Sequence, residues 1–385
     1  MSELADARAL EAPTPWPAIA GIIATVSVFA ISQGLTYPLL SLILQRQGAS
    51  PSMIGLSAAM TPLGIIASAA FIPAVSKRFG PGRTALACAA LSAVVLALIG
   101  WMNDPLAWFA LRFILGAVIN PLYVLSEVWM LTLAPPSRRG RLLGLYAMII
   151  SGGFAIGPLS LALVGSEGWA PFLIGIGAFL VCGACLASVL PRLPRLDLDE
   201  GSGSVRSFLP LAPVLLLAVV VAAAVEQAVL SLMPVYGPAH GIGETRVAVL
   251  LTVFIIGNVA LQVPLGLAAE RWSARSILIL CAAATALCSL LMIPLVDTVA
   301  LWPLVLIFGA VSFGLYSVAL VELSERFSGA MLVAGNSAFA MMYGVGGLAG
   351  PSGTGAVMDA IGPNGLPLSL GFVGLALAIF ALVRR

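Results

Sequence analysis

Charged side chains are scarce in this chain: Asp, Glu, Lys and Arg together make up only 9% of its 385 residues. About a quarter of the residues in a soluble domain are charged, so this composition excludes an ordinary soluble protein. Apolar residues instead make up 61% and give a mean hydropathy of +1.10. They form runs of helix-spanning length, and the short alternating segments of a membrane barrel are absent. The sequence therefore predicts an all-α integral membrane protein.

Histidine and net charge are scarce as well. With a formal net charge of +2, the chain offers no basis for binding nucleic acid. Its single histidine, His240, lies in a predicted loop without partners for a metal site. Cys182 and Cys185 form a C-x-x-C within an apolar run, which we interpret as buried apolar packing. The sequence also lacks a G-x-x-x-x-G-K-[ST] phosphate loop and a nucleophile elbow, so we expect no cofactor, no metal and no enzyme activity.

Twelve apolar runs are long enough to cross a bilayer as helices. The predicted spans are 17–45, 51–76, 84–102, 105–133, 142–165, 169–190, 209–236, 244–269, 275–296, 300–323, 330–358 and 365–383. The one long break between them is polar and rich in glycine and serine, which is typical of a flexible linker. The expected organisation is a cytoplasmic tail at 1–16, an N-terminal six-helix bundle at 17–190, a cytoplasmic linker at 191–208 and a C-terminal six-helix bundle at 209–385.

Basic residues gather on one side of the predicted spans. With both termini in the cytoplasm, fifteen of the eighteen Lys and Arg residues fall on the inner side, Arg46 and Arg246 fall outside, and Arg112 lies within a span. Cytoplasmic loops of membrane proteins carry this excess of positive charge. The first sixteen residues have more acidic than basic side chains and do not resemble a signal peptide. We therefore expect a multi-pass protein of the bacterial inner membrane with cytoplasmic termini.

The second half of the chain repeats the first at a constant offset of 193 residues. Without a gap, this shift superposes Gly64 on Gly257, Arg78 on Arg271, Gly116 on Gly309, Tyr123 on Tyr316, Gly153 on Gly346 and Gly157-Pro158 on Gly350-Pro351. Chance matches among Gly, Ala and Leu do not explain shared Arg, Tyr and Pro at one offset. Two parallel halves of this kind are typical of some secondary transporters.

One predicted helix carries its polar groups on a single face. Arg112, Gly116, Asn120, Tyr123 and Glu127 follow one another at helical spacing, with apolar residues on the remaining faces. An arginine and a glutamate in an apolar span are costly unless they face a bundle interior or a watery cavity. We interpret the stripe as cavity-lining; the alternative is that Glu127 is solvated at the membrane surface. Arg112 and Glu127 are about 22 Å apart along the helix, so they cannot pair directly.

A second acid, Glu226, lies deep in the seventh predicted span. Loss of hydration favours the neutral form of a carboxyl, so Glu226 is a candidate to take up and release a proton near neutral pH. The repeat places Gln33 of the first span opposite it, which makes a pseudo-symmetric polar pair. The alternative for Glu226 is a purely structural hydrogen bond between helices. Glu322, near the inner end of the tenth span, is expected to be solvated together with Glu325 and Arg326.

Two predicted loops carry a short basic motif. Between spans eight and nine the sequence reads Gly266-Leu-Ala-Ala-Glu270-Arg271-Trp-Ser-Ala-Arg275, and between spans two and three a degraded copy contains Lys77, Arg78 and Gly80. With its twelve spans and two halves, the chain resembles the major facilitator superfamily, whose loop reads G-x-x-x-D-R-x-G-R-R. The resemblance covers nearly all of the chain. It implies two pseudo-symmetric six-helix bundles around a central cavity.

The resemblance also implies roles for individual residues. Spans one, four, seven and ten line the cavity in this superfamily. The resemblance therefore implies that polar residues of these spans contact the substrate, namely Gln33, Tyr37, Asn120, Tyr123, Gln227 and Tyr316. The alternative for Tyr123 and Tyr316 is that they anchor the chain at the membrane interface. Arg112 and Gly116 match an R-x-x-x-G pattern that is associated with proton coupling in relatives. The loop residues that would act as a conformational clip are Arg78, Gly80, Gly266, Glu270, Arg271 and Arg275.

Spans five and eleven repeat a G-x-x-x-G-P motif, made by Gly153, Gly157 and Pro158 and by Gly346, Gly350 and Pro351. Small residues four apart permit close helix contact, and the proline permits a bend. In the superfamily the fifth-span motif resembles the signature of drug–proton antiporters, which favours efflux; the alternative is that helix packing alone accounts for the motif in both spans. The segments 126–129 and 139–146 are similar to a little-characterised bacterial subgroup with an E-S-W-like motif before an R-G-R loop.

Together these features predict a monomeric secondary active transporter that moves a small organic molecule across the membrane by alternating access. Proton-coupled efflux by antiport is the leading interpretation, with Glu226 as proton carrier, Glu127 as the second candidate and Arg112 as modulator. Proton-coupled uptake of a polar nutrient such as a sugar, an organic acid or an amino acid is the alternative. A non-transporting receptor or scaffold is the alternative outside transport. The expected partners are the substrate, protons and the lipid bilayer.

Overall fold

The structure is a computed structural model that describes residues 16–102, 104–135, 139–194 and 205–384. The expected tail apart from Trp16, and the middle of the expected linker, lie outside the described residues. Every regular element among the described residues is helical. Twelve of these helices are long and apolar enough to cross a membrane, so the predicted all-α fold with twelve spans is confirmed.

The spanning helices follow the predicted order with small shifts at their ends. They are α2 (Trp16–Arg46), α3 (Pro51–Ala69), α5 (Pro81–Trp101), α6 (Pro105–Leu133), α7 (Arg139–Val164), α8 (Ala170–Val189), α10 (Pro213–Ala239), α11 (Glu244–Trp272), α12 (Ala274–Leu295), α13 (Leu301–Arg326), α14 (Gly329–Ile361) and α15 (Gly365–Val383). Three short helices join them, namely α4 (Ile72–Phe79), η2 (Leu190–Arg192) and α9 (Val205–Phe208). Proline occupies the first turn of several spans, where its missing N–H costs nothing.

The second predicted span differs from the structure. Instead of one helix, the chain forms α3 and α4 with a break at Ala70 and Phe71. Pro73 follows the break, and because proline has no backbone N–H, it cannot bond back to the carbonyl of Ala69. Gly80 then ends α4 with a φ of 87°, a left-handed conformation that suits glycine, and α5 begins directly after it.

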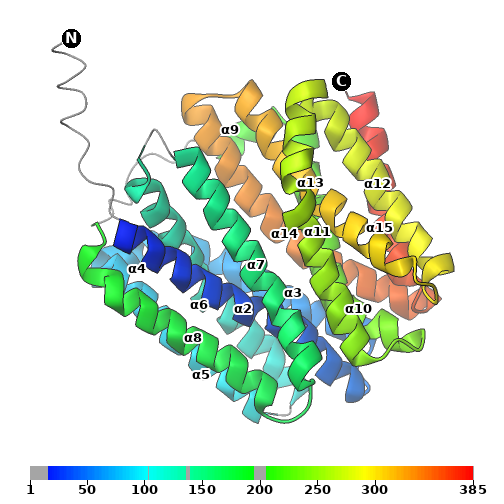
Figure 1. The fold of residues 1–385 in the computed structure, drawn as a ribbon, viewed down its shortest axis with the longest axis horizontal. Helices are drawn as coiled ribbons and strands as arrows, with labels where there is room; N and C mark the ends of the chain where they lie inside the picture. Colours follow the sequence, from blue (N-terminus) through cyan, green and yellow to red (C-terminus); the bar gives the residue numbers. More distant parts are fainter. Residues whose placement is uncertain (1–15, 103, 136–138, 195–204, 385) are drawn as a thin grey trace.

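The helices form two groups with the same internal arrangement. Figure 1 shows α2–α8 in the cooler colours on one side and α10–α15 in the warmer colours on the other. In the first group α2 packs on α7 and α8, α3 on α6, and α5 on α6 and α8. In the second group α10 packs on α14 and α15, α11 on α13, and α12 on α13 and α15. Each pairing of the first group recurs in the second, as the internal repeat leads one to expect.

Glycine contacts show that the repeat extends to single residues. Gly116 of α6 touches the backbone of α3 at Thr61, and Gly309 of α13 touches the backbone of α11 at Phe254. The two glycines, and also their two partners, are separated by the offset of 193 residues. At each contact a Cβ atom would overlap a carbonyl oxygen, so only glycine permits this close approach of the helices.

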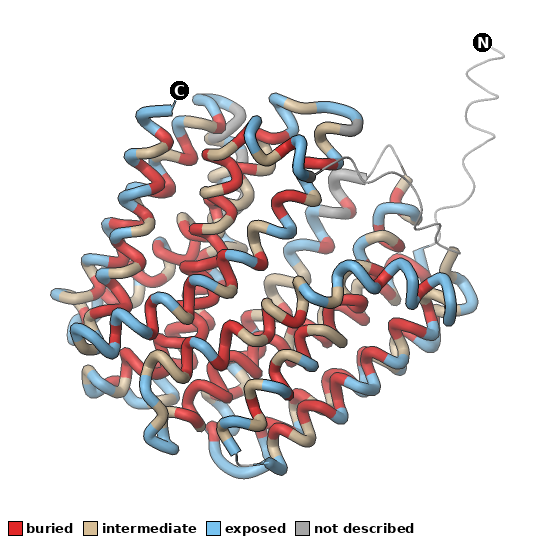
Figure 2. The backbone as a smooth tube through the Cα atoms, turned by 180° about the vertical axis from the view of Figure 1, so that it is seen from behind, coloured by how far each residue is buried: buried red, intermediate tan, exposed pale blue. Residues whose placement is uncertain are grey.

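The two groups meet along two seams. α3 packs on α14 and α7 packs on α11, while α2 and α10 also touch. Because the repeat relates α3 to α11 and α7 to α14, the two seams are equivalent. α10 is the most enclosed span, with 89% of its most apolar stretch buried against 28% for that of α7. Along most other helices buried and exposed positions alternate (Figure 2), as expected when one face meets protein and the other meets lipid.

Candidate functional site

Five of the six tyrosines in the chain converge between the two groups of helices. They are Tyr37 in α2, Tyr123 in α6, Tyr146 in α7, Tyr316 in α13 and Tyr343 in α14. Each is close enough to another of these tyrosines, to Glu127 or to Glu226 for the two side chains to interact electrostatically. We call these five residues the tyrosine cluster. Because its members come from both groups, the cluster spans the junction between them.

Glu226 of α10 reaches the tyrosine cluster from the second group. The residue is 8% exposed, and its carboxylate accepts a hydrogen bond from the hydroxyl of Tyr343. It also lies within electrostatic range of Tyr37 and Tyr123, which belong to the first group. Among the described residues, no basic side chain pairs with it. A buried carboxyl with one neutral donor can exist with or without its proton, as proton carriage requires.

Arg112 of α6 is buried in the first group, with 1% of the residue exposed. Its guanidinium lies 5.9 Å from the centre of the Tyr37 ring, and its Nη1 is 3.5 Å from Ser57 Oγ. Its Nε has no partner among the described residues. Tyr37 is within electrostatic range of both Arg112 and Glu226, so this ring connects the arginine to the carboxylate.

Glu127 of α6 occupies a more open part of the same junction. The residue is exposed, although protein lies close to its carboxylate. It lies within electrostatic range of Tyr146 in α7 and of Tyr316 in α13, which belong to different groups. No described side chain forms an ion pair with it. Glu127 therefore faces the junction between the groups and not the surrounding lipid.

The two glutamines expected at the site are both buried. Gln33 of α2 is 3% exposed and Gln227 of α10 is 7% exposed. The Gln227 side chain packs against Gly347 of α14, and its Oε1 has no hydrogen-bond partner among the described residues. A buried acceptor without a partner is costly, so Gln227 is available to a donor that enters the junction.

Asn120 lies at a helix contact within the first group, and its contact with substrate stays a prediction. Its Nδ2 donates to the carbonyl of Ile65 at 2.9 Å and to Ser68 Oγ at 3.1 Å, both in α3. The residue is 6% exposed and ties α6 to α3 within the first group. Spacing along α6 places Asn120 on the polar face but does not reveal which helix packs against that face.

The two G-x-x-x-G-P motifs lie at equivalent helix contacts, α7 against α2 and α14 against α10. Their glycines and the residues that they meet are Gly153 with Ser27, Gly157 with Gly34, Gly346 with Val220 and Gly350 with Ala224. Pro158 and Pro351 are buried inside helices that continue past them. The motifs therefore draw α7 and α14 close to the helices that carry Gln33 and Glu226, and helix packing accounts for both copies.

The loops expected to form a conformational clip are described in part. Arg78, near the end of α4, is exposed, and Gly80 follows it at the turn into α5. Arg271, near the end of α11, is exposed as well. Gly266 and the side chain of Glu270 are not among the described parts of the chain, so the clip stays a prediction there.

Arg275 connects the start of α12 to two other helices of the second group. It donates to the carbonyl of Ala381 in α15 at 3.2 Å and pairs with Glu322 of α13 at 3.7 Å. Glu322 is 6% exposed and also pairs with Arg326 at 3.1 Å. The expectation that Glu322 is solvated is therefore wrong, because arginines from two helices enclose it. These contacts hold α12, α13 and α15 together at one end.

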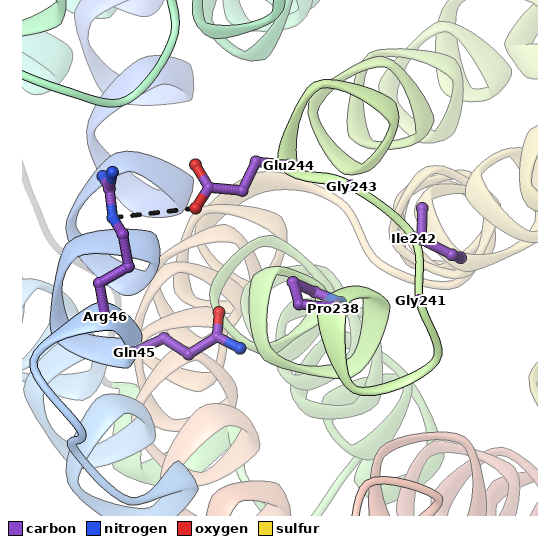
Figure 3. Close-up of a pocket in the computed structure, with 7 residues that line it drawn as sticks. All are labelled: Gln45, Arg46, Pro238, Gly241, Ile242, Gly243 and Glu244. Carbon is purple, nitrogen blue, oxygen red and sulfur yellow. Dashed lines mark ion pairs between the residues drawn. The ribbon is translucent and has the colours of Figure 1, made fainter.

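Arg46 links the two groups at the end of α2. Its Nε lies 3.8 Å from a carboxylate oxygen of Glu244 at the start of α11. Figure 3 marks this ion pair with a dashed line. Within the first group Arg46 donates to the carbonyl of Ser166 at 2.7 Å and pairs with Glu167 at 3.1 Å. The Ser166 hydroxyl donates in turn to Glu244. A cavity of about 370 Å³ lies beside this ion pair, walled by the end of α2 and by residues 238–244.

The sequence does not reveal this link between the groups, because Arg46 and Glu244 lie far apart in the chain. The available signal is that Arg46 is one of only two basic residues expected on the outer side. A second contact between the groups joins the backbone N–H of Ser52 in α3 to Asp359 of α14 at 3.1 Å. Within the part of the chain that the structure describes, no three His, Cys, Asp or Glu side chains gather as a metal site would require.

Comparisons with known proteins agree with this architecture. The family model described as Major Facilitator Superfamily matches residues 22–243 and 215–385. The uncharacterized MFS-type transporter YfkF of Bacillus subtilis (strain 168) is 25% identical over 370 residues, which cover 93% of this chain and 94% of that protein. The uncharacterized MFS-type transporter YcaD of Escherichia coli O9:H4 (strain HS) is 28% identical over 297 residues, or 75% of each chain.

Solved structures share the fold at low sequence identity. The nucleoside transporter NupG aligns with a TM-score of 0.78 at 13% identity and covers 95% of this chain and 98% of its own. A bacterial homologue of the human lysosomal transporter Spinster, in an inward-facing and unoccupied conformation, aligns with a TM-score of 0.76 at 13% identity, over 97% of this chain and 96% of its own. Since the family model matches nearly the whole sequence and the twelve spans agree with it, this chain belongs to the major facilitator superfamily of membrane transporters.

Proposed function

We propose that this chain is a proton-coupled exporter, which exchanges protons for a small organic molecule across the bacterial cytoplasmic membrane. The observation that carries the proposal is the placement of Glu226, which is buried at the junction and hydrogen-bonded to Tyr343. In transporters that work by alternating access, the halves rock about a site between them. A carboxyl at that place meets one side of the membrane and then the other, so it can carry a proton across.

The two groups of helices serve in this proposal as the moving bundles, at 17–190 and 209–385. The excess of basic residues on one side supports cytoplasmic termini. In that orientation Arg46 and Glu244 lie at the outer end, where their contact closes the path to the exterior. Export then requires this contact to break while the inner ends of the bundles come together.

The side chains at the junction favour export of an amphiphilic compound over uptake of a polar nutrient. Tight binding of a polar nutrient needs several precisely placed hydrogen-bonding groups. Asn120 uses its amide on α3, and Arg112 is buried against Tyr37. Gln227 offers one acceptor that is unpaired among the described residues, and the tyrosine cluster contributes aromatic rings from both groups. Such surfaces bind the apolar body of an amphiphile while their hydroxyls contact its polar end.

Proton movement in proteoliposomes tests the proposal. The purified chain would be reconstituted around a pH-sensitive dye and challenged with a panel of amphiphilic amines, neutral dyes, sugars, organic acids and amino acids. We expect an amphiphile to move in one direction and protons in the other. Glu226→Gln should abolish the proton movement because the amide has no proton to exchange.

Glu325→Gln is the matched control for this substitution, because Glu325 is exposed at the end of α13. It removes one carboxylate and should leave exchange unchanged. Compound and protons that move in the same direction would support uptake by symport instead. Compound movement without protons would overturn proton coupling, and a wild type that moves no member of the panel would favour a receptor or scaffold.

A further inference from the structure

A cavity of about 940 Å³ opens at the end of the second group where α10 begins and α15 ends. Its volume lies within the range of sites that bind small organic ligands. The wall is formed by the start of α10, by α12 and α13 and by the end of α15, so it belongs entirely to the second group. Glu226 lies about 20 Å further along α10, counted from Pro213. The cavity is therefore separate from the junction and from the proposed path of transport.

Positive charge exceeds negative charge in the wall of this cavity. Of the described residues, three arginines and one glutamate line it, namely Arg275 of α12, Arg326 and Glu322 of α13, and Arg384 directly after α15. Glu322 pairs with Arg275 and Arg326 through the same oxygen, Oε1. No carboxylate among the described residues forms an ion pair with Arg384. Three guanidinium groups against one carboxylate leave an excess of two positive charges, which an anion from outside the chain would neutralise.

Hydrogen-bond donors at this cavity are left over as well. Arg275 donates through Nη2 to the carbonyls of Ala381 and Arg384, whereas its Nη1 has no hydrogen-bond partner among the described residues. α10 begins at Pro213, directly after Ala212, and an alanine side chain cannot cap the N–H groups of the first turn. Both of these residues line the cavity, so the positive end of the α10 dipole lies at its wall. An anion with several acceptor oxygens matches this set of donors.

Phosphate is the anion that arginine forks and helix N-termini recognise best, because both offer N–H donors together with positive charge. We infer that this cavity binds a phosphate group, held by Arg326 and Arg384 at the start of α10. The phosphate comes either from the headgroup of an anionic phospholipid or from a soluble phosphate ester. Leu211 and Leu382 also line the cavity and are 44% and 52% exposed, which suits the acyl chains of a lipid.

A phosphate in this cavity would join parts of the second group that are distant in the sequence, namely the start of α10 and the ends of α13 and α15. Because the complete wall exists only in the folded chain, a bound phosphate stabilises the protein by mass action. The ligand is distinct from the transported compound, since the cavity lies within one group of helices. The inference therefore holds whichever direction or coupling the transport has.

The midpoint of thermal unfolding of the purified, delipidated full-length protein in a nonionic detergent tests the phosphate site. Dioleoylphosphatidylglycerol is the lipid probe, and dioleoylphosphatidylcholine, with the same acyl chains and no net charge, is its blank. Glycerol 1-phosphate is the soluble probe. We expect phosphatidylglycerol to raise the wild-type midpoint saturably and beyond the effect of phosphatidylcholine. The lipid concentration that gives half of the maximal shift should increase about fivefold in Arg326→Gln and in Arg384→Gln.

The soluble probe separates the two sources of phosphate. A shift by glycerol 1-phosphate that reaches the lipid's maximum, at a similar concentration and with the same loss in both arginine variants, would support the site and assign it to soluble phosphate esters. A shift by phosphatidylglycerol alone, again reduced in both variants, would support the site and assign it to lipid.

Two further variants guard against misfolding and unspecific charge effects. Arg384→Lys keeps the positive charge and should stay closer to the wild type than Arg384→Gln. Arg83→Gln removes an exposed arginine near the start of α5, the helix that the repeat relates to α12, and should respond to both probes as the wild type does. A wild type that responds to neither probe beyond the blank, or equal responses by the wild type, Arg326→Gln and Arg384→Gln, would overturn the phosphate site. None of these outcomes bears on Glu226, whose role depends on the proteoliposome experiment alone.

Discussion

The hydroxyl of Tyr343 in α14 donates a hydrogen bond to the carboxylate of Glu226 in α10. α14 is also the helix that forms a seam with α3 of the other group. At this seam Gly347 of α14 lies against Pro62 of α3, one helical turn from Tyr343. α10 and α14 belong to the same group and pack on each other, so the hydroxyl stays with the carboxylate when the groups move. The hydrogen bond therefore helps to set how readily Glu226 takes up and releases its proton at the junction.

Tyr343→Phe removes this donor and keeps the ring that packs on Tyr316. A hydroxyl donor stabilises the charged carboxylate, so its loss favours the protonated form. We expect compound-driven proton exchange to need a pH that is higher by about one to two units, the equivalent of one hydrogen bond to a charged group. The measurement is the pH profile of exchange in proteoliposomes. Tyr236→Phe is the matched control, because Tyr236 lies outside the tyrosine cluster, and an unchanged profile for Tyr343→Phe would contradict this role of the Tyr343 hydroxyl.

Glu244→Gln should weaken closure of the end of the molecule where α2 meets α11. The side chains of Arg46 and Glu244 are 33% and 38% exposed, and such pairs contribute up to about 1 kcal/mol, or roughly a fivefold shift in a two-state equilibrium. Spin labels at Gln47 and Thr245, both exposed and on different groups, would report the distance between the ends. We expect a larger population at long distances, most clearly at low salt.

Glu167→Gln serves as the control for this substitution. Glu167 also pairs with Arg46, at 3.1 Å, but both residues belong to the first group. Its loss removes the same charge without removing a contact between the groups. If both substitutions shift the label distances equally, then the effect comes from charge alone and the Arg46–Glu244 contact does not hold this end closed.

The fold could be predicted because it depends on features that are local in the sequence or repeat within it. Apolar runs define the spans, and the single offset of 193 residues relates the two groups down to Gly116 and Gly309. The break between α3 and α4 has a local signal as well, since Pro73 cannot continue the preceding helix. The expectation of one continuous span at 51–76 rests on hydropathy alone and neglects Pro73.

The partners of the site residues could not be predicted, because side-chain pairing depends on which helix faces are in contact. Asn120 is on the expected polar face of α6 and yet serves α3, and Glu322 is buried between arginines. Tyr343 was missed for a related reason: the residue equivalent to it under the repeat is Ile150, so no symmetric pair draws attention to it. The five tyrosines of the cluster come from five different spans, so their convergence becomes visible only once the packing of the helices is known.

Glu322→Gln should destabilise the second group at the end where α12, α13 and α15 meet. The substitution leaves Arg275 and Arg326 without the carboxylate that pairs with both. These arginines are 23% and 47% exposed, so water partly compensates for the loss. We expect a cost of about 1–2 kcal/mol, measured as a lower midpoint of thermal unfolding in detergent. Glu325→Gln, which removes an exposed carboxylate three residues along the same helix, should leave the midpoint unchanged.

Gly116→Ala and Gly309→Ala should destabilise the protein by similar amounts. In each case the added Cβ meets a backbone carbonyl of the neighbouring helix, at Thr61 and at Phe254, and a backbone cannot move aside as a flexible side chain can. Overpacking of this kind costs about 1–3 kcal/mol. Gly177→Ala is the control, because nothing lies within 4 Å of its added Cβ in α8. There alanine should stabilise the helix by about 0.5–1 kcal/mol. The midpoint of thermal unfolding, measured for the three variants, separates the effect of the helix contact from that of helix propensity. Equal changes for Gly116→Ala and Gly177→Ala would mean that the close approach of α6 and α3 contributes nothing to stability. Matched decreases for Gly116→Ala and Gly309→Ala would show that the two groups are equivalent in energy as well as in arrangement.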